Sequence, residues 1–159
     1  MAVRPVLIRR SPAVVWKVLS DCRRYADWVV GTREARPSHG DWPEPGSALR
    51  YEVGVGPWRL PGRTVVRVCE PRRRLELEAE AGRLGTARIA LELRPWGPDT
   101  LVIVDEHPLT GPGGRLHNAL SEALLQQRHR RMLRNLASVV EAAGSPSDAG
   151  TRTGAPPGW

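Results

Sequence analysis

Few side chains in this sequence could do chemistry, and the one with the most informative surroundings is a histidine near the C-terminus. His129 recurs with Leu125, Met132 and Leu136 at helical spacing, so all four would share one apolar helix face. An imidazole titrates near neutral pH. His129 is therefore either a cavity-lining acid, base or donor to a ligand oxygen, or a histidine hydrogen-bonded within the core. Its neighbour Arg128 either anchors a carboxylate or phenolate or extends along its stem into water.

Two adjacent acids stand on the last predicted strand, and only one of them can face the interior. Asp105 and Glu106 follow each other directly, so their side chains point to opposite faces of the strand. Both faces of this strand carry apolar residues, and periodicity leaves open which acid points inward. An inward Glu106 would form a buried ion pair with Arg128 or His129, and such a pair is either structural or catalytic.

Aromatic residues supply the remaining candidates. Tyr51 occupies an inward-phased strand position and could hydrogen-bond a ligand through its hydroxyl. Trp28 and Trp58 are candidates for the mouth of a cavity, although large aromatic residues at such positions more often belong to the core. The candidate catalytic residues are thus His129, Glu106, Arg128 and Tyr51.

The elements that must position these residues begin with a strand over residues 3–9. The Ser-Pro pair at 11–12 predicts a helix start, because serine caps free N–H groups and proline suits the first helical position. A second, shorter helix is expected over residues 22–28, where Tyr25 and Trp28 share a face.

A sheet is predicted next. A short strand over residues 32–36 is followed by a Pro- and Gly-rich loop over residues 37–47. From residue 48 to residue 107 apolar residues alternate with Glu and Arg, which indicates antiparallel strands with one buried and one wet face. In this pattern Val66 and Val68 share a face, and Glu76 points to water.

Turns are expected at Pro71, Gly82, Gly85, Pro95, Gly97 and Pro98, with a hairpin bend at Gly54–Gly56.

The C-terminal part reads as a helix over residues 115–143, and residues 144–159 have no periodicity and read as a disordered tail. The folded domain is therefore expected to span residues 1–143. The predicted fold is α+β, with a curved antiparallel sheet of about six or seven strands around the long helix. The predicted fold and the strand positions expected to face inward together predict which residues line a ligand. They are Trp28, Tyr51, Val53, Val66, Leu77, Leu91, Glu106, Arg128, His129 and Met132.

Composition excludes several classes of protein. The formal net charge is +7, but every basic residue except Lys17 is an arginine, and no aromatic residue is interleaved with the basic runs as base stacking requires. We therefore expect no nucleic-acid partner.

Cys22 and Cys69 lack metal or disulfide spacing, and the remaining histidines share no ligand spacing with acids, so we expect neither a metal nor another cofactor. No apolar run resembles a signal peptide or a membrane span, and a cytoplasmic monomer or homodimer is expected.

Four segments carry a resemblance to a known family: VWKVLSDCRRYADWVVG (residues 15–31), WPEPGSALRYEVGVGP (residues 42–57), GTARIALEL with the later DEHPLTGP, and RHRRMLRNL in the last helix. With these segments the chain resembles the SRPBCC superfamily, in its polyketide cyclase/dehydrase and lipid transport branch, related to START and Bet v 1 domains. The resemblance implies a helix-grip fold with a deep cavity between the sheet and the long helix. It also implies that Glu106 tends to lie at the sheet–helix contact.

Two main functions remain open, because this scaffold hosts carriers, sensors and enzymes. The first is a carrier or sensor that binds a hydrophobic small molecule, such as a lipid or polyketide, in the cavity. The second is an aromatase/cyclase-type enzyme in which His129, Glu106, Arg128 and Tyr51 move protons during ring closure. A co-chaperone-like interaction domain is a weaker third alternative. We favour the carrier or sensor, because no catalytic constellation can be recognised in the sequence.

Overall fold

Seven antiparallel strands form one curved sheet in the order β1-β7-β6-β5-β4-β3-β2 in the computed structural model. The structure describes residues 2–55, 57–80, 85–110 and 119–143. The strands are β1 (Ala2–Ile8), β2 (Thr32–His39), β3 (Ala48–Val55), β4 (Trp58–Glu70), β5 (Arg74–Glu80), β6 (Thr86–Trp96) and β7 (Asp99–Thr110). The helices are α1 (Pro12–Leu19), the 3-10 turn η1 (Cys22–Arg24), α2 (Tyr25–Trp28) and α3 (Ala119–Ala143).

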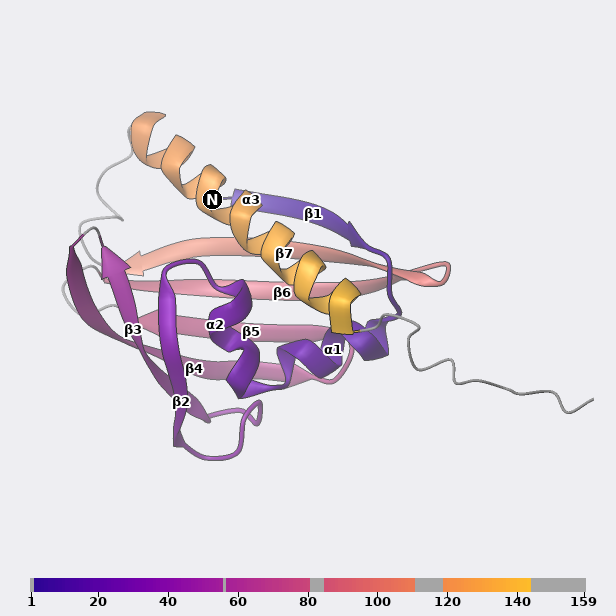
Figure 1. Ribbon diagram of the computed structural model, residues 1–159, viewed down its shortest axis with the longest axis horizontal. Helices are drawn as coiled ribbons and strands as arrows, with labels where there is room; N and C mark the ends of the chain where they lie inside the picture. Colours follow the sequence, from indigo (N-terminus) through magenta and orange to yellow (C-terminus); the bar gives the residue numbers. More distant parts are fainter. Residues whose placement is uncertain (1, 56, 81–84, 111–118, 144–159) are drawn as a thin grey trace, which may run out of the picture.

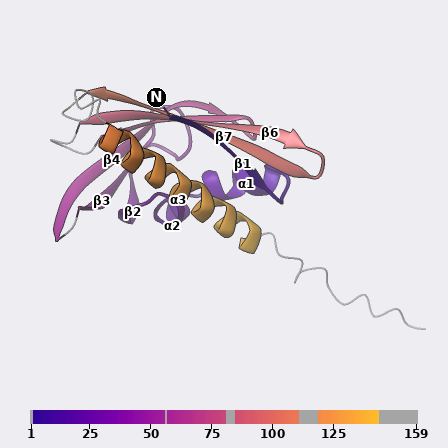
Figure 2. The same cartoon turned by 90° about the horizontal axis from the view of Figure 1, so that it is seen from above.

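The helices lie on one side of the sheet, with α3 crossing it diagonally in front of β1, β7 and β6 (Figures 1 and 2). The α+β helix-grip fold that was expected is confirmed, including the long C-terminal helix and the short helices after β1. Residues 115–118 of the predicted helix and the predicted tail over residues 144–159 lie outside the described residues. In the described part of the chain, no helix is both long enough and apolar enough to cross a membrane.

Three strands are longer than their sequence patterns predict. β2 continues through Pro37 to His39, which the sequence assigned to a loop; β2 is an edge strand, where a proline does not remove a ladder hydrogen bond. β4 begins at Trp58 because Gly54 and Val55, expected in a bend, remain in β3 and pair with Arg59 and Trp58. Pro95, expected in a turn, pairs with Thr100 near the end of β6.

A β-bulge between Val66 and Val68 corrects the prediction that these two residues share a face. Val66 is opposite the buried Leu77, whereas Val68 is opposite Glu76. Directly opposed residues of antiparallel strands point to the same side of the sheet. Because a bulge adds one residue to a strand, it reverses the phase beyond it, and Val68 lies on the outer face.

The first helix begins where the sequence predicts, although its cap differs. Pro12 occupies the first turn of α1, but the Ser11 side chain makes no capping bond, and only its carbonyl accepts from Val14 and Val15. η1 is capped by Asp21, whose carboxylate accepts from the Arg23 backbone N–H at 3.0 Å.

The end of α3 is tied to the end of β1. The Arg10 guanidinium donates to the carbonyl oxygen of Glu141 at 2.8 Å, and the Arg9 backbone N–H donates to the Glu141 carboxylate at 3.2 Å. The last carbonyls of a helix have no partner within the helix, so Arg10 supplies one of the missing donors. This contact fixes where α3 ends over the sheet and thereby where His129 lies along it.

Candidate functional site

Glu106 of β7 and His129 of α3 meet in the protein interior. A hydrogen bond joins Nε2 of His129 to Oε2 of Glu106, and the two side chains are 1 % and 6 % exposed. Glu106 is in register with Ile89, which is also buried, so its strand position faces the helices. Asp105 points to the outer face, where it bonds His107 at 3.0 Å. The structure thus decides between the two adjacent acids: Glu106 faces inward.

The Glu106 contact determines which ring nitrogen of His129 is available. An ionised carboxylate only accepts hydrogen bonds, so with Glu106 ionised Nε2 of His129 carries the proton in this contact. In a neutral ring the lone pair then lies on Nδ1. This atom is buried and has no hydrogen-bond partner among the described residues. His129 therefore presents a single acceptor, oriented by Glu106, to the interior.

A second polar group in the interior is a chain of three hydroxyls. Thr64 Oγ1 lies 2.8 Å from the Tyr25 hydroxyl and 2.7 Å from the Tyr51 hydroxyl. The three residues come from α2, β3 and β4, and all are buried. These hydrogen bonds join the short helix to the sheet. They also involve the Tyr51 hydroxyl, which the sequence suggested as a hydrogen-bonding group for a ligand.

Gly62 explains how the Tyr51 ring fits against the sheet. Gly62 is directly opposite Tyr51, and a Cβ atom at this position would lie only 2.8 Å from Cδ2 of Tyr51 and closer still to Cε2. It would also lie 2.9 Å from a methyl carbon of Val53. Only glycine leaves room for the ring over the β4 backbone, and this placement directs the Tyr51 hydroxyl to Thr64.

Aromatic rings fill the space beside this hydroxyl chain. Tyr25 lies edge-on to Trp28 and to Trp42, with ring centroids 5.4 Å and 6.0 Å apart, and it lies 5.3 Å from the Tyr51 ring. Trp42 donates from Nε1 to the Leu19 carbonyl at 3.2 Å. Trp28 is 1 % exposed, yet its Nε1–H has no partner among the described residues. It is thus a second buried polar atom without a partner, after Nδ1 of His129.

Most of the predicted ligand-lining residues lie in this interior. Trp28, Tyr51, Val66, Leu77, Leu91 and Met132 belong to one buried cluster, and Val53 packs against it. The side chain of Arg128 lies outside the described residues. Trp58, proposed with Trp28 for a cavity mouth, is 72 % exposed near the end of the β3–β4 hairpin, whereas Trp28 is in the core.

Sequence reasoning missed Thr64 and Trp42. Thr64 precedes Val66 by two residues, so the strand period already placed it on the inward face. Trp42 lies in the Pro- and Gly-rich loop, and no periodic signal indicated that it would pack on Tyr25.

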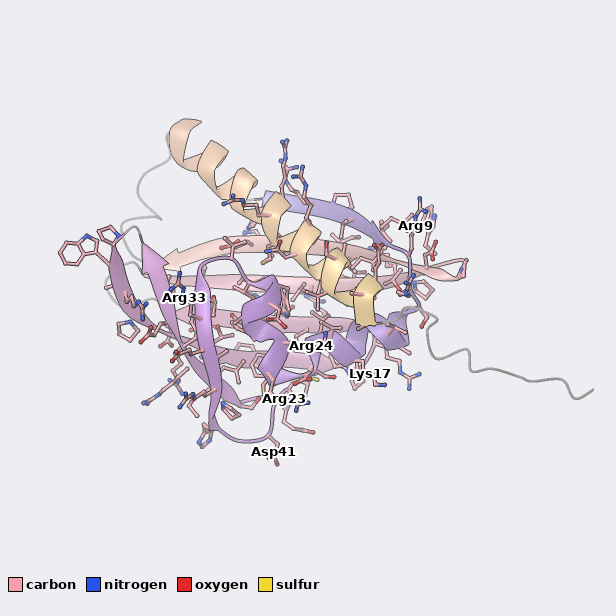
Figure 3. The ribbon with its side chains drawn as sticks, in the orientation of Figure 1. Arg9, Lys17, Arg23, Arg24, Arg33 and Asp41 are labelled. Carbon is pink, nitrogen blue, oxygen red and sulfur yellow. The ribbon has the colours of Figure 1, made fainter. Side chains whose placement is uncertain are left out.

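Asp21, which caps η1, and Cys69 on β4 have shifted pKa values. The hydrogen bond from the Arg23 side chain, supported by its backbone N–H and charge, lowers the pKa of Asp21 below 3.8. Burial raises the pKa of the Cys69 thiol. Asp21 also lines a surface hollow of about 270 Å³ between the ends of α1 and α3, together with Lys17 and Arg24. Lys17 and Arg24 are labelled in Figure 3. Among the described residues, no cluster of three metal-binding side chains is present.

Comparison with known proteins supports the sequence resemblance. Residues 2–141 match the family described as "Polyketide cyclase / dehydrase and lipid transport". No match was found among curated protein sequences.

Solved structures of low sequence identity share the fold. A START superfamily protein from Mycobacterium smegmatis has 16 % identity and a TM-score of 0.73, with 89 % of this chain and 97 % of that chain covered. The Zhui aromatase/cyclase from Streptomyces sp. R1128 has 16 % identity and a TM-score of 0.69, with 91 % and 97 % covered. Ara h 8.0201 has 8 % identity and a TM-score of 0.70, with 89 % and 97 % covered. At these identities the likeness is one of fold.

Proposed function

The chain belongs to the polyketide cyclase/dehydrase and lipid transport family of the SRPBCC superfamily, and from this membership we propose that it binds a hydrophobic small molecule between the sheet and α3, as a carrier or sensor. The ligand would contact the predicted ligand-lining residues of the buried cluster. Glu106 and His129 would lie at its α3 side and Tyr51 at its β3 side. Cys22 and Cys69 are free thiols, which fits a cytoplasmic location.

The observation that carries this proposal is a pair of polar atoms that are buried in the interior without hydrogen-bond partners among the described residues. Trp28 Nε1–H and His129 Nδ1 are each on a side chain that is 1 % exposed. Buried polar atoms almost always have a hydrogen-bond partner, and leaving one unpaired costs about 1–3 kcal/mol. A ligand with matching oxygen atoms would satisfy both.

The two atoms require different hydrogen-bonding groups on a ligand. Trp28 Nε1 is a donor only, so it suits a carbonyl or ether oxygen. His129 Nδ1 is an acceptor while Nε2 donates to Glu106, so it suits a hydroxyl group. We therefore propose an apolar ligand that carries a hydroxyl and a carbonyl or ether oxygen.

Fluorescent probes test this proposal. A naphthol has an apolar ring and one hydroxyl, and its methyl ether lacks the donor. The protein should bind the naphthol about 10-fold more tightly than the ether, the value of one hydrogen bond. His129→Phe should remove this preference, and Trp58→Phe, a change at an exposed ring, should leave it unchanged. No binding of either probe, with no apolar molecule extracted from the purified protein, would contradict the proposal.

The Glu106–His129 contact favours an aromatase/cyclase-type enzyme as the second candidate. A carboxylate that orients an imidazole is a common arrangement for a general base. Nδ1 of His129 would take a proton from a poly-β-keto chain during an aldol step and return it during dehydration, and Tyr51 or Arg128 would bind a ketone oxygen. Turnover of such a chain, lost in His129→Ala and reduced in Glu106→Gln, would establish this activity. Equal turnover in both variants and the wild type would exclude it.

A further inference from the structure

Three arginines stand in one row across the outer face of β2, β3 and β4. Arg36 is directly opposite Arg50, and Arg50 is directly opposite Arg63. Opposed residues point to the same side of the sheet, with neighbouring strands about 4.8 Å apart. All three side chains are exposed, and none has an ion pair or hydrogen bond among the described residues.

Such a row lowers the stability of the protein unless an anion accompanies it, because like charges directly opposite each other repel. The neighbouring acids do not neutralise it. Glu80 is opposite Arg63 but forms no ion pair with it among the described residues, and Glu52 pairs with Arg59 at 3.4 Å. An anion that bridges two guanidinium groups would reverse the sign of this interaction.

A hollow in the surface marks where an anion would lie. A cavity of about 200 Å³ is lined by Arg50, Pro61, Gly62, Arg63 and Glu80. Arg50 and Arg63 both line this hollow, and guanidinium groups donate strong, charge-assisted hydrogen bonds to phosphate oxygens. Arg33, three residues before Arg36 on the edge strand β2 and directly opposite Glu52, lies beside this row (Figure 3).

The placement of the arginines is not explained by protection of the sheet edge alone. Charged residues on edge strands prevent pairing with other proteins, which accounts for Arg33 and Arg36 on β2. Arg50 and Arg63 lie on β3 and β4, which are paired on both sides. Their exposure without acidic partners requires another explanation.

We propose that this outer face, defined by Arg33, Arg36, Arg50 and Arg63, docks on the surface of an anionic lipid bilayer, whose phosphate groups bind between the arginines. The exposed large apolar residues in the described part of the chain are Val3, Leu7, Trp58 and Trp96. Trp58 is in phase with Gly62 and points to the inner face, and the other three are on β1 and β6, which lie away from β2, β3 and β4 in the sheet. A protein partner would require an apolar centre, and a single-stranded nucleic acid would require stacking rings. A charged bilayer surface requires neither.

This proposal deepens the proposed function, since it names the bilayer as the place where an apolar ligand enters or leaves. Docking is measured without any ligand, so failure of the docking surface and failure of ligand binding are distinguished.

Vesicle co-sedimentation tests it. The full chain should bind vesicles of equimolar phosphatidylglycerol and phosphatidylcholine, and it should not bind pure phosphatidylcholine. Arg36→Gln/Arg50→Gln/Arg63→Gln should weaken binding by about 100-fold, since each arginine near an anionic surface contributes about 5-fold. The triple variant should melt at the same or a higher temperature without vesicles, because it removes repulsion.

A matched control keeps the net charge equal. Arg130, Arg131 and Arg134 are exposed on α3 and have no partner among the described residues, so changing all three to Gln removes the same charge elsewhere. This variant should bind anionic vesicles like the wild type. An equal loss of vesicle binding in both triple variants would show that only the net charge matters, and it would overturn the proposal. Tighter binding to a duplex oligonucleotide than to the vesicles at equal salt, or release by equal concentrations of inorganic phosphate, would also overturn it.

Discussion

Glu106 and His129 are 23 residues apart in the chain, yet they hydrogen-bond to each other where α3 crosses β7. Both side chains are almost completely removed from water. Removing one partner would leave the other buried and unpaired, which destabilises a protein more strongly than the loss of an exposed pair.

We therefore predict that Glu106→Ala lowers the free energy of unfolding by about 3–5 kcal/mol, as for other broken buried pairs. Glu106→Gln retains an acceptor and should cost less. Asp105→Asn is the matched control, because Asp105 forms a more exposed pair with His107 and should change stability by about 0–1 kcal/mol. Urea unfolding measures all three. Similar losses for Glu106→Ala and Asp105→Asn would contradict the buried contact.

Gly62→Ala should lower stability by about 1–3 kcal/mol, the usual effect of overpacking, because the new methyl group overlaps the Tyr51 ring. Gly54→Ala on the opposite strand is the control, since its only near contact is the Gly31 carbonyl at 3.9 Å. Tyr51→Leu removes the ring and should make Gly62→Ala less destabilising in that background, with the close contact to Val53 remaining. Thermal unfolding of the two single variants and the double variant checks this; additive effects would argue against the overlap.

Leu91→Ala should lower the free energy of unfolding by about 2–5 kcal/mol, because Leu91 is fully buried in the sheet–helix core. Leu7→Ala truncates a leucine that is 44 % exposed on β1 and should change stability by about 0.5 kcal/mol or less. Denaturant unfolding at matched conditions compares them. A small effect at Leu91 would mean that the inward face of β6 is assigned incorrectly.

Glu76 is a buried acid on the outer face of the sheet, contrary to the prediction that it points to water. Arg74 and Arg88 each donate to one of its carboxylate oxygens, and Glu76 is 1 % exposed. Glu76→Ala should lower stability by about 1–3 kcal/mol, because it removes two hydrogen bonds between charged groups. Glu92→Ala breaks an exposed pair with Arg94 and should cost about 0–1 kcal/mol. Equal losses of stability in Glu76→Ala and Glu92→Ala would mean that the burial of Glu76 does not strengthen its ion pairs.

Asp21 should make stability depend on pH. Its folded pKa is lowered, first by the Arg23 side chain, so its contribution is present above the ordinary pKa of 3.8 and is lost as pH falls through the folded pKa. Asp21→Ala should therefore destabilise the protein near neutral pH by about 0.5–2 kcal/mol, the range for a lost cap, and by less in strong acid. Ser20→Ala, a neighbouring change without a titrating group, should show no such pH dependence. A constant difference between wild type and Asp21→Ala would refute the role of the ionised carboxylate.

The sequence by itself determined the order and type of the elements. Alternation of Leu, Val and Ile with Glu and Arg fixed which strand positions of β5 and β6 face inward, because the strand period is two. The helical spacing of His129, Met132 and Leu136 placed all three on one buried face, and burial of these three side chains confirms it. Such local periodicity needs no knowledge of partners.

Only the tertiary structure decided which acid meets His129, where the β4 bulge reverses the phase, and how Glu76 is buried. Both faces of β7 are apolar, so choosing Glu106 over Asp105 required knowing which side α3 covers. The bulge depends on pairing with β5, and Glu76 is buried by Arg74 on its own strand and Arg88 on the next. These features arise from contacts between segments far apart in the chain, and neighbouring residues alone do not encode them.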